Sequence, residues 1–249
     1  MSTYSPNPKR LIMTVGDSRV GKSTVIRLLI DLLCCQGKRI RAYDHDNRKR
    51  LDPYKCLVPV KSINFNEGTD SVIEELRNGY DALVIDMPGQ HIDSICNYID
   101  KVNLFKILGF VDWRLTFVQP ISHRLDCVEY LSVLVDFAGN QADYLVVKNQ
   151  HFDRRFKLYQ DLSCFQLIAL GGTDIVLGAL NKYSYEAIES ISLPYSQVSS
   201  NINIFSIYRA YAYRWVSSFH QSILNNSLAC EYLGLLQIRP QQEPNYDDF

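Results

Sequence analysis

The segment from Leu11 to Gln36 constrains the fold of this chain more than any other part of the sequence. It reads as a β-strand over Leu11–Val15, a glycine-containing turn over Gly16–Ser23 and a helix over Thr24–Gln36. The turn fits the pattern G-x-x-x-x-G-K-[ST], in which backbone N–H groups point at phosphate oxygens. The strand before it and the apolar helical pattern after it favour this interpretation over a glycine turn without a ligand. The sequence therefore predicts a phosphate-binding loop.

Two side chains of the turn carry the chemistry expected of such a loop. Lys22 would reach the β- and γ-phosphates as a point charge and is the first catalytic candidate, and the Ser23 hydroxyl would hold Mg²⁺. The start of the helix adds a partial positive charge where the phosphates would lie. The predicted nucleotide contacts in this region are Gly16, Asp17, Ser18, Arg19, Val20, Gly21, Lys22, Ser23 and Thr24.

The bulk composition limits the class of protein. The chain has 249 residues, 47% of them hydrophobic, and a net charge of −1, which allows a sizeable core and gives no global field for nucleic acid or anionic membranes. Its seven cysteines suit neither a disulfide framework nor zinc, and no apolar run approaches the ~20 residues that span a bilayer. We expect a cytoplasmic chain without a membrane partner, forming one domain over 1–249, with a flexible lead-in at 1–9 and a loose tail at 237–249.

Strand-like and helix-like segments alternate along the chain. The predicted strands cover residues 11–15, 39–43, 58–65, 82–85, 115–118 and 144–149, with Pro120 stopping the fifth, and 165–170 is read as a further strand. The predicted helices cover residues 24–36, 71–78, 92–105, 124–138, 173–182 and 204–224, and 47–57 is a loop. This alternation predicts the α/β class, with a parallel β-sheet flanked by helices on both faces.

Acidic residues follow the second predicted strand, at the edge of the sheet where ligands bind in such folds. Asp44 and Asp46 lie two apart and so face the same side of the strand. One of them would position the attacking water, and we favour Asp46 for this catalytic role. For Asp44 a structural cap is an equal alternative, and His45 between them is expected to face away.

A second acidic position follows the apolar strand at 82–85. Asp86 is expected to hold Mg²⁺ through water, together with Ser23, and Asp46 is a further candidate for the metal shell. Gly89 comes three residues after Asp86, where a backbone N–H of many nucleotide switches senses the γ-phosphate.

The order of these motifs resembles the ParA/MinD branch of the SIMIBI class of P-loop ATPases. The similarity runs from the loop through Gly37-Lys38-Arg39 and Asp44-His45-Asp46 to Tyr80–Gly89, in the order of the family's Walker A, Walker A′ and Walker B motifs. Val146–Asn149 is similar to the family's adenine-reading strand and Leu193-Pro194 to its base-side loop. The resemblance covers about residues 10–225 and is nearest to plasmid-borne ATPases of conjugal transfer, mobilisation or stability.

The resemblance implies a switch ATPase that binds and hydrolyses ATP with Mg²⁺ and acts with a protein partner in DNA transfer, plasmid partition or intracellular positioning. It places Asn149 and Pro194 on the base. It also implies a nucleotide-dependent homodimer, for which the family uses a second lysine in the loop. Asp17 stands at that position, so we expect the dimer to be weak.

Contact with DNA would have to come from a local patch. The cations between Lys148 and Lys157 form the better candidate for weak nonspecific contact, and Arg209 and Arg214 among aromatic residues form the other.

Two other functions fit parts of the sequence. Asp86–Gln90 looks like the D-x-x-G-Q motif of Rab-type small GTPases, which makes a GTP-binding switch one alternative, although Lys148–His151 does not match their N-K-x-D motif. The other alternative is a small-molecule ligase or kinase on the same scaffold. Such an enzyme needs a pocket for its acceptor substrate, and the sequence shows no second group of catalytic residues beyond the P-loop site.

Overall fold

Seven parallel strands form the central sheet of the computed structural model, which describes residues 8–45, 49–63 and 69–235. Their spatial order is β3-β2-β4-β1-β5-β6-β7. The strands are β1 Lys9–Thr14, β2 Ile40–Asp44, β3 Val60–Ser62, β4 Ala82–Asp86, β5 Trp113–Ile121, β6 Ala142–Asn149 and β7 Thr173–Leu177. All pairings are parallel, so the carboxyl ends of the strands meet at one edge.

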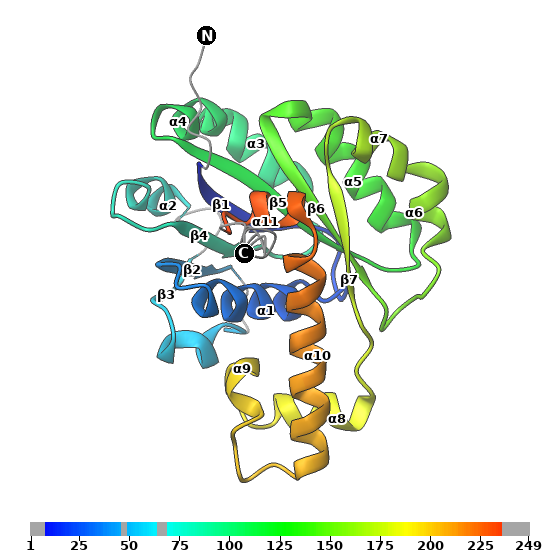
Figure 1. Ribbon diagram of the computed structural model, residues 1–249. Coiled ribbons are helices and arrows are strands. Elements are labelled where there is room, and N and C mark those ends of the chain that lie inside the picture. The colour runs from blue at the N-terminus through cyan, green and yellow to red at the C-terminus, as the bar shows by residue number, and fades with distance from the viewer. Residues whose placement is uncertain (1–7, 46–48, 64–68, 236–249) are drawn as a thin grey trace, which may run out of the picture.

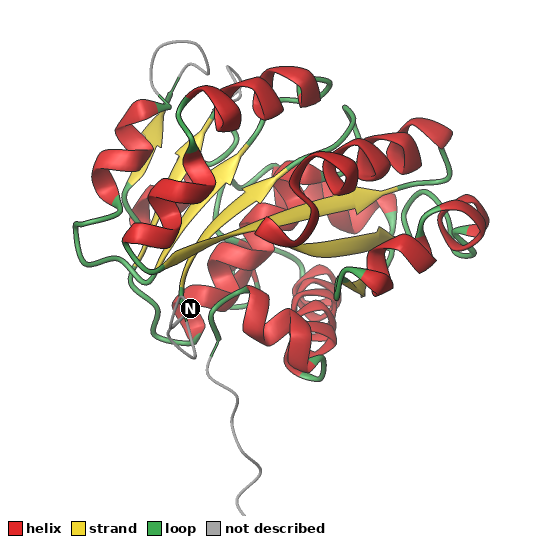
Figure 2. Ribbon diagram, turned by 90° about the horizontal axis from the view of Figure 1, so that it is seen from above, coloured by secondary structure: helices red, strands yellow, loops and turns green. Residues whose placement is uncertain are grey.

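Helices cover both faces of the sheet, as Figures 1 and 2 show. One face carries α1 Lys22–Cys35, α8 Lys182–Glu189, α9 Tyr195–Val198, α10 Ser206–Leu224 and α11 Ser227–Tyr232. The other carries α2 Asp70–Glu75, α3 Ile92–Lys101, α4 Leu104–Phe110, α5 Leu125–Ala138, α6 Lys157–Leu162 and α7 Cys164–Ala169. Short 3₁₀ turns lie at Asp52–Cys56 and Gly139–Gln141. The predicted fold class, a parallel sheet with helices on both faces, is confirmed.

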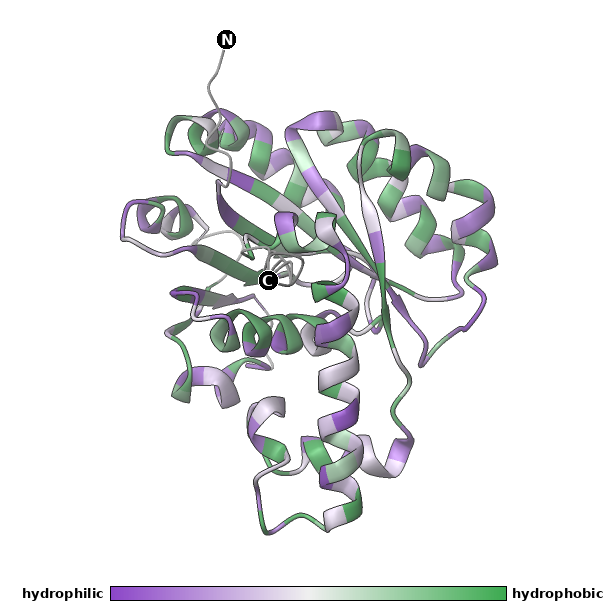
Figure 3. Cartoon of the chain, in the orientation of Figure 1, coloured by the Kyte–Doolittle hydropathy of each residue, from purple (hydrophilic) through white to green (hydrophobic). Residues whose placement is uncertain are grey.

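Alternate residues of each central strand enter two separate hydrophobic cores. On β1, Leu11 and Met13 point to the core under α2–α7, and Ile12 points to the core under α1 and α10. Both faces are buried, which explains why these strands are continuous apolar runs. Figure 3 shows this distribution, with hydrophobic residues concentrated on the strands and on the helix surfaces against them.

The two elements predicted over 165–182 are wrong. The apolar run at 165–170 belongs to helix α7, where Leu167 is buried while Phe165 and Ile168 are exposed. The strand is instead β7, which pairs with β6 and buries Ile175 and Leu177 at alternate positions. A short apolar run does not by itself distinguish a helix from a strand, and pairing with β6 decides the outcome here.

Smaller differences have local causes. The predicted helix at 92–105 is two helices, because Asn103 adopts a left-handed backbone with φ 55° between α3 and α4. Strand β5 continues through Pro120, because its pairing with β1 ends at Val118 and no hydrogen-bond donor is needed on that side. Within the predicted strand at 58–65, β3 covers Val60–Ser62, and residues 64 and 65 lie outside the described residues.

Helix α1 is buried around its whole circumference, since every residue from Val25 to Leu33 is buried. Two of them, Arg27 and Asp31, are charged and therefore need partners. The Asp31 carboxylate accepts hydrogen bonds from the Tyr54 hydroxyl (2.9 Å) and from the Ser196 hydroxyl (2.5 Å). These bonds tie α1 to the 3₁₀ turn after β2 and to α9.

Among the described residues, no helix combines the length and the hydropathy that crossing a bilayer requires.

Two glycines should respond to alanine in opposite directions. A Cβ on Gly172 would lie 2.5 Å from Leu167 Cδ1 and 3.1 Å from the Leu167 carbonyl oxygen, whereas a Cβ on Gly109, within α4, would meet nothing within 4 Å. We expect Gly172→Ala to lower the free energy of unfolding by ~1–3 kcal/mol through overpacking. Gly109→Ala should raise it by up to ~1 kcal/mol through helix propensity. Urea titrations of both variants check the pair, and equal effects would contradict it.

The buried carboxylate of Asp31 should make stability depend on pH. Burial raises the pKa of Asp31 to about 6, against the lowering effect of its hydrogen bonds from Ser196 and Tyr54. The folded protein therefore binds this proton more tightly than the unfolded chain, and the stabilisation is lost as pH rises from about 4 to about 6. We expect Asp31→Asn to flatten that fall by at most about 3 kcal/mol. Unfolding titrations at several pH values would show parallel curves if this assignment were wrong.

Candidate functional site

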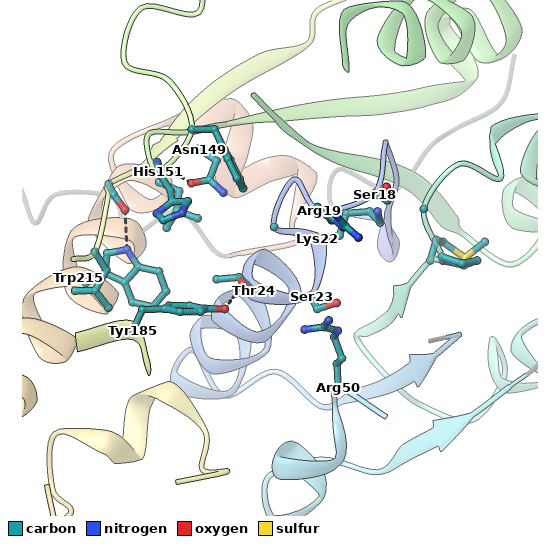
Figure 4. Close-up of a pocket in the computed structure, with 18 residues that line it drawn as sticks. Ser18, Arg19, Lys22, Ser23, Thr24, Arg50, Asn149, His151, Tyr185 and Trp215 are labelled. Atoms are coloured by element: carbon teal, nitrogen blue, oxygen red, sulfur yellow. Dashed lines mark hydrogen bonds between the residues drawn. The ribbon is translucent and has the colours of Figure 1, made fainter. Parts of the chain in front are cut away.

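A cavity of about 590 Å³ opens at the carboxyl edge of the sheet. One end is formed by the loop after β1 together with Arg50 and the segment after β4. The other end is formed by residues from β6, β7, α8 and α10. The lining residues are Ser18, Arg19, Gly21, Lys22, Ser23, Thr24, Arg50, Met87, Pro88 and Gly89 at the first end and Asn149, His151, Phe152, Leu177, Gly178, Leu180, Tyr185 and Trp215 at the second. Figure 4 shows the labelled residues of both ends facing this space.

The backbone of the loop requires its two glycines. Gly16 and Gly21 have φ values of 116° and 97°, a left-handed region that side chains disfavour. A Cβ on Gly21 would also lie 2.6 Å from the Asn149 amide nitrogen. Asn149 can therefore approach the loop, and its amide nitrogen donates to the Val20 carbonyl oxygen at 3.0 Å. The end of β6 is thus fastened to the loop.

Lys22 begins α1 and is buried. Its Nζ donates to the carbonyl oxygens of Asp17 (2.6 Å) and Gly16 (3.2 Å), which holds the ammonium group across the loop. Of the predicted nucleotide contacts in the loop, three do not line the cavity, namely Gly16, Asp17 and Val20. The others line it: Ser18, Arg19, Gly21, Lys22, Ser23 and Thr24. The Thr24 hydroxyl also lies 3.2 Å from the Tyr185 hydroxyl, which joins α1 to α8.

The structure corrects the role expected for Asp17. Its carboxylate is buried, forms an ion pair with Arg124, and accepts a hydrogen bond from the Ser18 backbone N–H at 2.6 Å. Arg124 also donates to the Ser18 carbonyl oxygen at 2.7 Å. The charge of Asp17 is therefore compensated within its own chain, which reduces its repulsion of a second subunit but does not replace the lysine that the family has at this position.

Asp86 and Ser23 provide oxygens that fit a magnesium ion. Asp86 ends β4, is 1% exposed, and accepts a hydrogen bond from Thr14 through Oδ1 (3.0 Å), while its Oδ2 is buried without a hydrogen-bond partner. Burial raises the pKa of Asp86 to about 6, and interactions with Ser23, Thr14 and Lys22 act in the opposite direction. An unsatisfied buried carboxylate oxygen next to a hydroxyl is a suitable ligand pair for a hard cation, which would also offset the cost of burying the charge. No cluster of three or more His, Cys, Asp or Glu side chains suited to a metal occurs in the described ranges. The remaining ligands of such an ion would therefore be phosphate oxygens and water.

Asp44 lies next to Asp86 in the sheet and holds the loop that follows β2. The two residues are direct partners in the β2–β4 register, and Asp44 Oδ2 accepts a hydrogen bond from the Leu51 backbone N–H at 2.9 Å. Neither Asp44 nor Asp86 lines the cavity directly, and it is the hydrogen bond from Leu51 that favours the structural alternative for Asp44 over the catalytic one. His45 is buried, and burial lowers its pKa to about 4. Asp46, the favoured catalytic candidate and additional metal ligand, lies outside the described residues.

Gly89 is in close contact with the loop. A Cβ at this position would lie 2.8 Å from Ser18 Cα and 2.9 Å from Ser18 N. Only a glycine allows the segment after β4 to approach the loop so closely. Met87, Pro88 and Gly89 all line the cavity, which keeps the predicted γ-phosphate sensor next to the predicted phosphate site.

The second end of the cavity differs from the prediction. Asn149 lies there, but Pro194 precedes α9 and does not line the cavity. The described residues that form this end are mostly apolar or aromatic, with Tyr185 and Trp215 among them, and Trp215 is fixed by a hydrogen bond from its Nε1 to the Gly178 carbonyl oxygen (2.7 Å). The sequence placed Trp215 only within an aromatic helix and assigned no role to Tyr185.

The proposed basic patch at 148–157 is smaller than the sequence indicated. Lys148 forms an ion pair with Asp174 (2.6 Å), whereas Arg154, Arg155 and Lys157 are exposed. Compensation of Lys148 leaves fewer cations for contact with DNA or a second subunit.

Comparison with known proteins identifies the fold. No family model and no curated protein match the sequence. Among solved structures, the chain is similar to the cell division protein FtsY of Thermotoga maritima, with a TM-score of 0.51, 15% identity, and coverage of 73% of this chain and 65% of that chain. It is also similar to the signal recognition particle receptor FtsY of Elizabethkingia anophelis, with a TM-score of 0.50, 15% identity, and coverage of 88% and 68%. The chain thus spans just under two thirds of the Thermotoga protein.

The fold is that of the SIMIBI class of P-loop NTPases. The predicted fold is confirmed, because the likeness to these structures is a likeness of fold. The two similar structures described above are FtsY proteins rather than members of the ParA/MinD branch. The finer resemblance to that branch, and to its plasmid-borne members, stays a prediction.

Removal of the Lys22 ammonium should abolish tight binding of nucleoside triphosphates. The group is the loop's fixed charge next to the predicted β- and γ-phosphate positions, so we expect Lys22→Ala to weaken binding by at least about 100-fold, or ~2.7 kcal/mol. Isothermal titration with Mg²⁺ checks this, with Lys182→Ala, an exposed lysine of α8, as the matched control. Unchanged affinity in Lys22→Ala would reject the assignment of the loop.

Proposed function

We propose that this chain is a nucleotide-dependent switch NTPase that binds a nucleoside triphosphate and Mg²⁺ in the cavity at the carboxyl edge of the sheet. The observation that carries the proposal is that one cavity has a glycine-containing P-loop with Lys22 and Ser23 at one end and an aromatic surface at the other. Phosphates would lie on the loop and the start of α1, and the base would lie between β6, β7 and α10.

Each residue of the phosphate end has a proposed role. Lys22 binds the β- and γ-phosphates, and Ser23 and Asp86 hold the magnesium ion, which when bound supplies charge compensation for the triphosphate. Gly89 keeps the segment after β4 against Ser18, so that occupation of the γ-phosphate position acts on this segment. Asp46 remains our candidate for positioning the attacking water.

We propose ATP as the preferred nucleotide. Guanine recognition normally uses a carboxylate that accepts from the base, and none of the described residues lining the second end of the cavity is Asp or Glu. The Asn149 amide donates to Val20 and accepts from the His151 backbone N–H (3.2 Å), but an amide has further donor and acceptor capacity for adenine. GTP is the alternative, because Asp86–Gln90 looks like the D-x-x-G-Q motif of small GTPases. The two similar solved structures, a cell division protein FtsY and a signal recognition particle receptor FtsY, are not ParA or MinD proteins.

We also propose that the chain acts with a protein partner and forms a homodimer that depends on the nucleotide. The partner function in DNA transfer, plasmid partition or positioning rests only on the order of the motifs. The ion pair with Arg124 reduces the repulsion expected from Asp17, but the loop still lacks the family's second lysine, so we propose that the dimer is weak.

A competition experiment distinguishes the two nucleotides. We expect ATP to bind at least about tenfold more tightly than GTP, a difference of ~1.4 kcal/mol, because the base end offers no carboxylate to guanine. The measurement is displacement of a fluorescent ATP analogue by ATP or GTP at fixed Mg²⁺, with Lys22→Ala as the control that binds neither. Tighter binding of GTP would overturn the ATP proposal while leaving the NTPase proposal intact.

A further inference from the structure

Arg50 contributes a cation to the phosphate end of the cavity that the motifs do not include. It lies after β2, at the start of the segment leading to the 3₁₀ turn, and it lines the same cavity as Lys22 and Ser23. In Figure 4 its guanidinium points toward Ser23, from the side of the cavity opposite the P-loop.

The peptide unit that joins Arg50 to Leu51 is held at both of its polar groups. Its N–H, on the fully buried residue Leu51, donates to Asp44 Oδ2 at 2.9 Å. Its carbonyl oxygen, on Arg50, accepts two hydrogen bonds from the Arg27 guanidinium, one of them from Nε at 2.8 Å. These contacts fix the peptide plane on the carboxyl side of Arg50.

Arg27 is itself firmly placed. It is 8% exposed, and its Nη1 donates to both Glu189 carboxylate oxygens (2.9 and 3.0 Å) and to the Tyr195 hydroxyl (3.2 Å). Burial alone lowers the pKa of Arg27, but the interactions with Tyr195 and Glu189 outweigh burial and raise it, so the group stays charged. A buried arginine that directs two donors at one loop carbonyl holds that loop in place.

A guanidinium at the phosphate end of the cavity suits the chemistry of phosphoryl transfer. Charge accumulates on the oxygens of the transferred group, and a guanidinium stabilises it because its planar donors match two oxygens at once. Lys22 and Arg19 also line this cavity, and both belong to the P-loop, whereas Arg50 enters the phosphate end from the segment after β2. A guanidinium that faces Ser23 from that segment would meet a γ-phosphate bound on the loop.

We propose that Arg50 is a catalytic residue of this NTPase, supplied from the same chain, and that Arg27 is its positioning residue; the inference rests on the proposed function. In the step that Arg50 assists, the oxygen of water bonds to the γ-phosphorus, and the bond from phosphorus to the bridging oxygen breaks. The electron pair of that bond leaves on the nucleoside diphosphate. One proton of the water remains on the inorganic phosphate and the other is released to solvent. Arg50 binds the transferred group while its charge is redistributed.

The central test compares turnover with ground-state binding in Arg50→Ala and Arg50→Lys. We expect kcat to fall about 100-fold or more in both, because a lysine cannot make the paired contact, while the Kd for a non-hydrolysable ATP analogue changes less than about threefold. Affinity for ADP with aluminium fluoride, which imitates the transferred phosphoryl group, should fall with kcat. Lys55→Ala, an exposed lysine in the adjacent 3₁₀ turn, is the matched control and should keep normal turnover.

Guanidinium ions added in solution should restore part of the turnover of Arg50→Ala but not that of Lys22→Ala. For Arg27, we expect Arg27→Lys to lower kcat in the wild-type background and to have no further effect on kcat in Arg50→Ala, because both changes remove the same contribution. A purely structural role of Arg27 would lower kcat equally in both backgrounds.

The outcomes separate this inference from the proposed function. If Arg50→Ala turns over normally while Lys22→Ala does not bind, Arg50 is not catalytic and the NTPase proposal stands. If Arg50→Ala loses analogue binding as strongly as turnover, Arg50 binds the ground state only and the catalytic assignment is wrong. If the wild-type protein neither binds nor hydrolyses a nucleoside triphosphate, both proposals are overturned.

Discussion

The burial of helix α1 on every side is the constraint on which the rest of the site depends. The helix starts at the P-loop, and a buried helix can carry charges such as Arg27 and Asp31 only if neighbouring elements supply partners for them. Those partners come from the segment after β2 and from α8 and α9. The need to satisfy two buried charges therefore assembles three distant parts of the chain around the start of α1.

Much of the fold could be predicted from the sequence because its signals are local. The apolar run of β4 and the strand–turn–helix pattern at β1 and α1 are decided by residues that are neighbours in sequence. The positions of the helix and the strand over 165–182 could not be predicted, because the run from Phe165 to Leu170 is apolar except for Gln166 and carries no clear period. Pairing of β7 with β6, and the burial of Leu167 alone in α7, are decided by tertiary contacts.

In the candidate site, too, features set by local sequence could be predicted, and features set by contacts between distant segments could not. Residues of the P-loop, Asp86, Gly89 and Asn149 lie together as their positions at strand ends predicted, since parallel strands deliver their carboxyl ends to one edge. Arg124 and Arg50 were missed because their roles depend on contacts with distant segments. The sign of the charge at Asp17 was clear from the sequence, but its compensation by Arg124 was visible only in three dimensions.

The two ends of the cavity belong to parts of the chain that contact each other through α1. Thr24 at its start touches Tyr185 of α8, and Arg27 one turn later binds Glu189 of the same helix. A ligand that contacts both the P-loop and Trp215 binds most tightly to one relative position of the two ends of the cavity. It shifts the protein toward that position only to the extent that its affinity for that position exceeds its affinity for other positions. Arg27 also holds the segment that carries Arg50. Because Arg27 binds Glu189 of α8, a change in the position of α8 would shift this segment at the phosphate end. Under the proposed function, binding of the base and placement of Arg50 would therefore be coupled through Arg27, a single buried arginine.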